Sequence, residues 1–191
     1  DNMLPKYSVA TDVTDTQKDA VAKLMYHCGV AVKMNYGPES SASVSASHLA
    51  KYFGYDEDLM MDVRRASFSL DQWMQLIDTE LAAKRPILYD GQSSDGGHQF
   101  ICDGSDGDGL YHINWGWDGN QNGYFDLAIL NPEKGGTGSG NAADGYNRSC
   151  SMTIGIAPDN GVVDASLAQI PSVSVYRTGA VNITKGIRQK T

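Results

Sequence analysis

The chain has 191 residues, 41% of them hydrophobic, and its 15 basic against 23 acidic side chains give a formal net charge of −8. Nucleic-acid binding depends on clustered Lys and Arg, which an acidic chain does not favour. A bilayer span needs ~20 consecutive apolar residues, and no segment of this sequence has such a run. We therefore expect no nucleic-acid partner and no membrane span, in a chain long enough for one domain or one domain plus a tail.

Two helices and a short strand are expected in the first 54 residues. The first helix covers 12–28, is capped by Asp15 or Thr16 and ends at Gly29. A strand over 30–34 and a turn at 36–38 follow, and a Ser-rich stretch leads into a short helix that ends at Phe53. The first helix is predicted to bury an apolar stripe formed by Ala20, Val21, Leu24, Met25 and Cys28.

A capping box formed by Ser69 and Gln72 predicts a third helix that ends before Pro86. It buries Trp73, Leu76, Ile77 and Leu81. After Pro86 the hydrophobic period changes to 2, and Gly, Asp and Asn turns separate the segments, which predicts hairpin-connected strands. The strands are expected over 87–89, 98–103, 110–115, 124–127 and 152–156.

Helices followed by an antiparallel sheet predict an α+β fold. A Gly-rich segment, 135–145, is expected to form a mobile loop. The pattern weakens after Pro158, so we expect a domain over 1–157 and a tail, or the start of an extension, over 158–191. Because the chain begins with Asp1 and shows no leader, we expect a processed or excised piece of a longer protein.

The first candidate for chemistry is His98, which opens a strand directly after Gly96 and Gly97. Glycines beside a histidine let a substrate backbone approach closely, and a strand start holds the imidazole rigidly. The alternative is a structural histidine at a turn.

The second candidate is the segment 112–117. In a strand, Ile113 and Trp115 face one side while His112 and Asn114 face the other. The Asn114 side chain is suited to orient a catalytic histidine, and the neighbouring tryptophans to exclude water. One alternative is a set of core aromatics with a turn Asn. Another is a carbohydrate-binding platform formed by Trp115 and Trp117.

The segment 118–123 matches the first half of a calcium loop, but position twelve, Ile129, lacks the required Glu. A hairpin turn is therefore the preferred interpretation. The three cysteines form no CxxC pair, so a disulfide framework or a structural zinc site is not expected. Cys28 ends a helix, where a thiolate is disfavoured, and Cys102 lies about 13 Å along the strand from His98. Cys150 precedes a strand, so we expect all three to be buried fillers.

Residues 2–158 resemble the C-terminal half of the catalytic domain of streptopain-family cysteine peptidases, the papain-like C10 group. The matching segments are NMLPKYS at 2–8, MNYGP at 34–38, GGHQFICDG at 96–104, YHINWGWDGNQNGYFDL at 111–127, and LNP at 130–132 before the Gly-rich loop. The resemblance implies a papain-like α+β fold, represented mainly by its histidine-bearing antiparallel-sheet half with flanking helices.

The resemblance also implies roles for individual residues. His98 corresponds to the catalytic histidine, and Asn114 and Trp115 to the segment that orients and shields it. Gly97 corresponds to a main-chain contact with substrate, and Ser41 to a serine of the substrate cleft, although Ser40 or Ser43 is an alternative. In the family, a moderately apolar pocket takes the second substrate residue before the cleaved bond. Gln92 and Asp95 should make this pocket more polar in the present chain. Trp117 is assigned to substrate binding with Trp115.

The family's nucleophile lies in a Gly-Cys-Val/Ala-x-Thr/Ala segment at the start of a helix, and no such segment occurs here. We therefore expect the catalytic cysteine on an N-terminal fragment or preceding segment, with polypeptides as substrates, no cofactor, and a secreted or cell-surface bacterial location. Alone, this chain should expose the apolar face that packs against the cysteine half. The alternatives are a non-catalytic carbohydrate- or protein-binding module and an inactive peptidase homologue.

Overall fold

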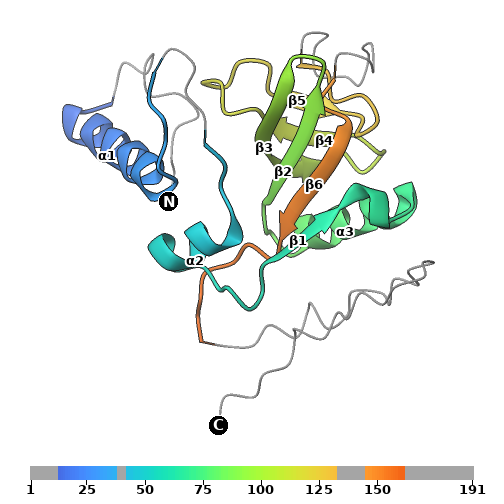
Figure 1. Ribbon diagram of the computed structural model, residues 1–191, viewed down its shortest axis with the longest axis horizontal. Helices are drawn as coiled ribbons and strands as arrows, with labels where there is room; N and C mark the ends of the chain where they lie inside the picture. Colours follow the sequence, from blue (N-terminus) through green and yellow to red (C-terminus); the bar gives the residue numbers. More distant parts are fainter. Residues whose placement is uncertain (1–12, 38–41, 133–144, 162–191) are drawn as a thin grey trace.

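A computed structural model describes residues 13–37, 42–132 and 145–161. The α-helices lie in the first part of the chain, together with one short strand, and five further strands of an antiparallel sheet follow, which confirms the predicted α+β class (Figure 1). The elements are α1 (Asp15–Ala31), α2 (Ala46–Phe53), β1 (Met61–Arg64), the short 3₁₀ helix η1 (Arg65–Ser67), α3 (Leu70–Ala82), β2 (Ile87–Ser93), β3 (Gly96–Ser105), β4 (Tyr111–Asn114), β5 (Gly123–Phe125) and β6 (Arg148–Ile154).

The sheet has six strands in the order β1-β6-β2-β3-β4-β5, and neighbouring strands run antiparallel. The five predicted strands correspond to β2 to β6 with bounds shifted by a few residues. The sequence analysis missed β1, because four residues that include the charged Asp62 and Arg64 are too few to show a period. This strand forms the edge of the sheet beside β6, with Met61 opposite Ile154.

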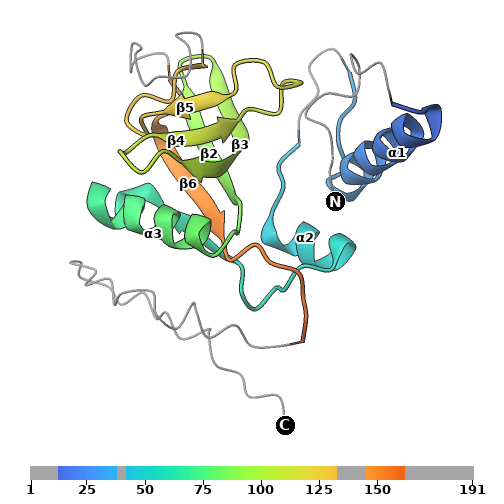
Figure 2. The same ribbon diagram turned by 180° about the vertical axis from the view of Figure 1, so that it is seen from behind.

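Helix α3 covers one face of the sheet in both views (Figures 1 and 2). Ser69 and Gln72 form the predicted capping box, and Trp73, Leu76 and Ile77 are buried. Trp73 Nε1 donates a hydrogen bond to the Tyr89 hydroxyl at 3.0 Å, which joins the helix to β2.

A buried ion pair joins the end of α3 to the end of β6. Arg85 Nε lies 2.8 Å from Glu80 Oε2, which also accepts a hydrogen bond from Gly155 N at 2.8 Å. Because each charge is buried with its partner, removing one of them would leave an uncompensated charge in the core.

The predicted capping residue and the predicted end of the first helix are both wrong. Thr14, not Asp15 or Thr16, caps α1 through a capping box with Gln17. The helix also continues past Gly29 to Ala31, so the expected strand over 30–34 does not form. A Cβ at Gly29 would meet the Tyr36 hydroxyl, so this glycine allows a close contact and does not end the helix.

The expected burial of the apolar stripe of α1 is also wrong. Leu24 and Met25 are 43% and 66% exposed, and only Gly29 and Ala31 of this helix are buried. The helix lies apart from the sheet in both views (Figures 1 and 2). Its apolar side chains therefore contribute little to the core that the sheet forms with α3.

Some predictions lie outside the described residues. These are Ser41, most of the expected loop at 135–145, and most of the tail, so the boundary near residue 157 remains a prediction. Within the described part of the chain, no helix is long and apolar enough to cross a membrane.

Candidate active site

His98 lies near the start of β3, opposite Gly91 of β2. Its half-buried imidazole is surrounded by aromatic rings. Trp117 stacks on it with centroids 4.9 Å apart and an interplanar angle of 26°, and the rings of Tyr146, Phe100 and Trp115 have centroids 5.4, 6.0 and 6.3 Å from it. Because aromatic rings pack around it, the imidazole is held in one place and partly shielded from water.

The Nε2 atom of His98 lies 2.8 Å from the main-chain carbonyl oxygen of Trp115. A carbonyl oxygen only accepts hydrogen bonds, so Nε2 carries the proton and Nδ1 of the neutral ring has the lone pair. Among the described residues no group is hydrogen-bonded to Nδ1. The structure therefore presents a histidine that is oriented through one nitrogen and available as a base through the other.

The Asn114 side chain does not contact the imidazole through a hydrogen bond. Its Oδ1 accepts one from Gly116 N at 3.0 Å, in the turn that follows β4. The acceptor that orients His98 is the main-chain carbonyl of Trp115. Every residue has such a carbonyl, so the sequence does not reveal which one acts as the acceptor. A catalytic role for Asn114 remains a prediction, and in this geometry Asn114 would act through the turn.

Asn122 is a site residue that the sequence analysis missed. Its Oδ1 accepts a hydrogen bond from Trp115 N at 3.0 Å, on the other side of the residue whose carbonyl holds His98. Asn122 belongs to the segment 118–123, which connects β4 to β5 as the expected hairpin turn. In the described residues no group of three or more His, Cys, Asp or Glu side chains is placed to hold a metal ion.

The surroundings of Gly97 leave room for a ligand. Gly97 is exposed, and a Cβ there would make only ordinary contacts, 3.8 Å from Gln92 Cγ and from Gly91 O. Strand β4 pairs with β3 only from Ile101 onward, so β4 does not cover this stretch of β3. Packing does not require a glycine at this position, which is consistent with the predicted substrate contact.

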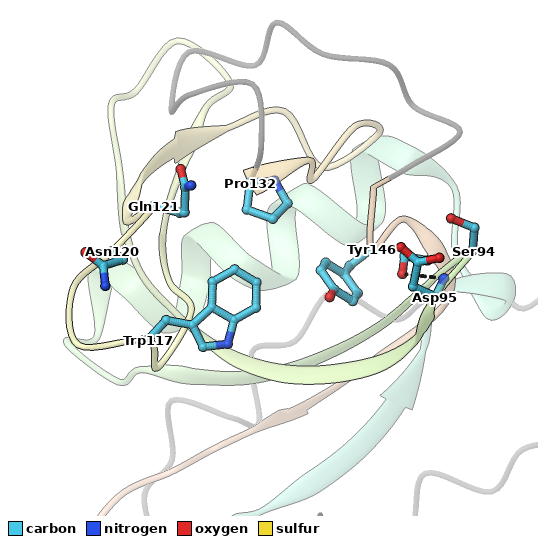
Figure 3. A pocket seen from close by; sticks show the side chains of 8 residues that line it. Ser94, Asp95, Trp117, Asn120, Gln121, Pro132 and Tyr146 are labelled. Atoms are coloured by element: carbon cyan, nitrogen blue, oxygen red, sulfur yellow. Dashed lines mark hydrogen bonds between the residues drawn. The ribbon is translucent and has the colours of Figure 1, made fainter. Parts of the chain in front are cut away.

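A pocket of about 610 Å³ lies behind two of the rings that pack on His98 (Figure 3). Its wall includes Trp117 and Tyr146, the two rings nearest to His98. Asp95 is the acidic side chain among the lining residues (Figure 3). The full lining is Ser93, Ser94, Asp95, Trp117, Asn120, Gln121, Pro132 and Tyr146.

Trp115 differs from Trp117 in exposure. The side chain of Trp115 is fully buried, so its ring cannot contact a substrate in this geometry. Trp117 is half-buried and lines the pocket while it stacks on His98. Of the two tryptophans predicted to bind substrate, the structure places only Trp117 where its side chain can reach one.

Ser41 lies outside the described residues, but the segment just after it is tied to the histidine strand. Gln99 Oε1 accepts a hydrogen bond from Val44 N at 2.8 Å, and Gln99 Nε2 donates to Val44 O at 3.1 Å. Gln99 Nε2 also donates to Asp90 Oδ1 at 3.1 Å. Burial raises the pKa of the Asp90 carboxyl above its usual range, although the bond from Gln99 acts in the opposite direction.

None of the three cysteines is placed as a nucleophile for His98. Burial raises the pKa of the Cys102 thiol to about 12 and also raises the pKa of the Cys150 thiol. Cys102 is four residues along β3 from His98, about 13 Å away. Cys150 Sγ donates to Tyr146 O at 3.7 Å, and Cys28 is half-buried on α1, apart from the sheet.

Comparisons with known proteins identify the family of this chain. Residues 1–125 match the peptidase C10 family. The chain belongs to the peptidase C10 family. It is 41% identical over 160 residues to streptopain of Streptococcus pyogenes serotype M28, which covers 82% of this chain and 39% of streptopain. It is also 31% identical over 172 residues to the thiol protease/hemagglutinin PrtT of Porphyromonas gingivalis, covering 88% of this chain and 19% of that protein.

Solved structures of C10 relatives match the fold. Active wild-type interpain A of Prevotella intermedia gives a TM-score of 0.64 at 33% identity, over 77% of this chain and 60% of that one. A prointerpain A fragment gives 0.59 at 35% identity, over 79% and 45%. The match with interpain A confirms the expected cysteine-peptidase fold. This C10 chain spans about two fifths of the length of streptopain.

Proposed function

We propose that this chain forms the histidine side of the active site of a bacterial cysteine endopeptidase, with the nucleophilic cysteine on a preceding segment or a separate N-terminal chain. One observation carries the proposal. The Trp115 carbonyl fixes the Nε2 proton of His98 beside an aromatic-walled pocket, so Nδ1 is the atom that exchanges protons. The position of the cysteine on another segment is supported by the burial or remoteness of the three cysteines present.

The chemistry follows from two protonation states of one imidazole. A cysteine thiolate attacks the carbonyl carbon of the scissile peptide, and the His98 imidazolium gives its Nδ1 proton to the leaving amine nitrogen as the C–N bond breaks. Nδ1 of the neutral ring then takes a proton from the water that hydrolyses the thioester. The Nε2–H···O=C bond to Trp115 exists in both states, so the ring does not have to turn between the two steps.

The surrounding residues fit a polypeptide substrate. Gly97 would let the substrate backbone approach β3, Ser41 would line the cleft, and the Trp117 pocket would take a substrate side chain. This chemistry requires no metal and no organic cofactor. Because the relatives are bacterial peptidases, we also propose a secreted or cell-surface location.

A carbohydrate-binding module is the weaker alternative. Its platform requires two exposed tryptophan faces, but Trp115 is fully buried and one face of Trp117 packs on His98. The two-tryptophan platform is therefore wrong for this structure. A protein-binding module and an inactive homologue without a cysteine half are separated from the peptidase by the following experiment.

The test is mass spectrometry under denaturing conditions on the natural protein, before and after treatment with the thiol-directed inhibitor E-64. We expect one inhibitor mass on a cysteine other than the three in this sequence. His98→Ala should slow this labelling strongly, because the thiolate loses its imidazolium partner, whereas His27→Ala on the exposed helix α1 should not. Labelling of Cys28, Cys102 or Cys150, or no labelling at all, would contradict the proposal.

A further inference from the structure

The peptide groups on both sides of Trp115 are held by asparagine side chains. The N–H of Trp115 donates to Asn122 Oδ1 at 3.0 Å. The next N–H, that of Gly116, donates to Asn114 Oδ1 at 3.0 Å. The Trp115 carbonyl lies between these two bonds and accepts the hydrogen bond from His98 Nε2. The acceptor that orients the histidine is therefore itself fixed in direction.

The Trp115 side chain adds to this constraint. It is fully buried, with Phe100 at a centroid distance of 4.6 Å and Phe125 packed edge-on at 5.3 Å. The ring therefore fixes the Cα position, while rotation of the peptide planes about it is limited by the hydrogen bonds of the main chain. Asn122 supplies one of these bonds from the following turn, seven residues along the chain.

We propose that Asn122 is a positioning residue, which holds the Trp115 carbonyl against His98 Nε2 and so maintains the Nε2–H tautomer and supports the imidazolium. This inference rests on the proposed function, because it assigns the residue that orients the proposed acid–base group. Asn122 does not touch the substrate or the reacting atoms in this account. It acts only through the main chain of Trp115.

The expected consequence has a defined direction. A carbonyl acceptor stabilises the imidazolium, because the charged ring donates a stronger hydrogen bond than the neutral ring. The Asn122 bond holds the Asn114–Trp115 peptide, which precedes the peptide that carries the Trp115 carbonyl. Its loss lets the main-chain angles of Trp115 change, so the carbonyl is directed less firmly at His98 and is a weaker acceptor. The imidazolium then loses part of its stabilisation, so the alkaline limb of the pH profile of kcat/KM should move to lower pH.

The experiment uses the full protein, including the segment that carries the nucleophile, with a peptide substrate. We expect Asn122→Ala to lower kcat about tenfold to a hundredfold with little change in KM, and to move the alkaline limb to lower pH. Asn122→Asp retains an acceptor oxygen at the same distance from the main chain and should restore kcat. Asp108→Ala, in the exposed turn between β3 and β4, is the matched control and should behave like the parent protein.

A second measurement does not depend on activity. Long-range ¹H–¹⁵N NMR spectra of the His98 ring distinguish the two tautomers, and we expect Nε2–H in the parent protein and in Asn122→Asp but a mixture in Asn122→Ala. If Asn122→Ala does not fold, Asn122→Ser, whose shorter side chain cannot reach Trp115 N in the same way, replaces it. A parent-like tautomer together with a parent-like pH profile in the Ala or Ser variant would overturn the proposal. An inactive parent protein whose tautomer still depends on Asn122 would overturn the peptidase assignment and retain the positioning role.

Discussion

The carboxamide of Gln99 makes hydrogen bonds with both main-chain groups of Val44, a residue 55 positions earlier in the sequence. Its NH₂ group also donates to the Asp90 carboxylate on β2. One side chain therefore connects the segment after Ser41 to two neighbouring strands, directly beside His98. In the proposed peptidase, this contact would hold one wall of the substrate cleft against the histidine strand.

Gln99→Glu should destabilise the fold. The carboxylate cannot donate to Val44 O or to Asp90, and it places a second negative charge beside the first. We expect the free energy of unfolding, measured by urea denaturation at neutral pH, to fall by about 1–3 kcal/mol. Gln92→Glu, at an exposed position of β2, introduces the same charge without these contacts and should have a much smaller effect. Equal destabilisation by the two variants would contradict the role of Gln99.

Asp90 should make stability depend on pH. Burial raises the pKa of its carboxyl, so the folded protein retains the Asp90 proton at pH values where the unfolded chain has lost it. The stabilisation from this group is therefore complete in acid and is lost as the pH rises through the folded-state pKa. Asp90→Asn should raise the free energy of unfolding at neutral pH, and the gain should shrink as the pH falls toward the usual range for aspartate.

The matched control for Asp90→Asn is Asp95→Asn, which makes the same charge change at an exposed position. Unfolding curves in urea, recorded over a series of pH values, compare the two. A gain for Asp90→Asn that does not vary with pH, or an equal gain for Asp95→Asn, would show that burial of Asp90 is not its cause.

The buried cysteines should react slowly with thiol reagents. At pH 8 a thiol with the pKa of Cys102, about 12, is thiolate in only about one molecule in 10⁴. We expect iodoacetamide to modify Cys102 and Cys150 only after unfolding, and to modify Cys28 on the exposed helix α1 first. Peptide mapping by mass spectrometry with and without denaturant measures this order. Rapid native labelling of Cys102 would contradict its burial.

Asp95 should influence the choice of substrate, because it contributes the negative charge of the pocket beside His98. A lysine or arginine side chain in this pocket gains an attraction of about 0–1 kcal/mol at such an exposed position. We therefore expect Asp95→Asn to lower the ratio of kcat/KM for a lysine peptide over a leucine peptide by about two- to fivefold. Asp108→Asn is the control for charge, and an unchanged ratio for Asp95→Asn would separate Asp95 from the pocket's specificity.

The sequence was most informative where the signal was local. The capping box at Ser69 and the period-2 strands after Pro86 correctly predict α3 and the central sheet, because cap and alternation depend on neighbouring residues. The predicted helix end at Gly29 is wrong, because this glycine makes room for the Tyr36 hydroxyl, a contact that only the folded chain shows. Strand β1 was too short to have a detectable pattern.

In the candidate site, too, local sequence patterns identify some residues, while contacts made only in the folded chain go undetected. His98 and Gly97 stand out in the sequence because two glycines before a histidine at a strand start form a distinctive local pattern. The acceptor that orients His98 is a main-chain carbonyl, which any residue type provides, so sequence reasoning assigned the task to the Asn114 side chain instead. The bonds from Asn122 to Trp115 and from Gln99 to Val44 depend on the turn and on long-range packing, which no local pattern encodes.

The exposed apolar side chains of α1 provide a test of what surrounds this chain. Leu24, Met25, Tyr26 and Val30 are all at least 43% exposed, on a helix that lies apart from the sheet. Apolar patches of more than a few hundred Å² rarely persist on a monomer. The 191-residue chain expressed alone should therefore dimerise or aggregate.

Polar substitutions of these exposed apolar side chains should reduce that association. We expect Met25→Glu combined with Val30→Lys to shift the 191-residue chain toward monomer in size-exclusion chromatography with light scattering, because the pair removes apolar area at no net charge. Asp19→Lys combined with Lys23→Glu, at polar positions of the same helix, is the matched control and should leave association unchanged. In the full protein, Met25→Glu with Val30→Lys should instead destabilise the fold, since α1 would then pack against the cysteine-bearing segment. A compact, stable monomer of the parent 191-residue chain would argue against the half-enzyme arrangement.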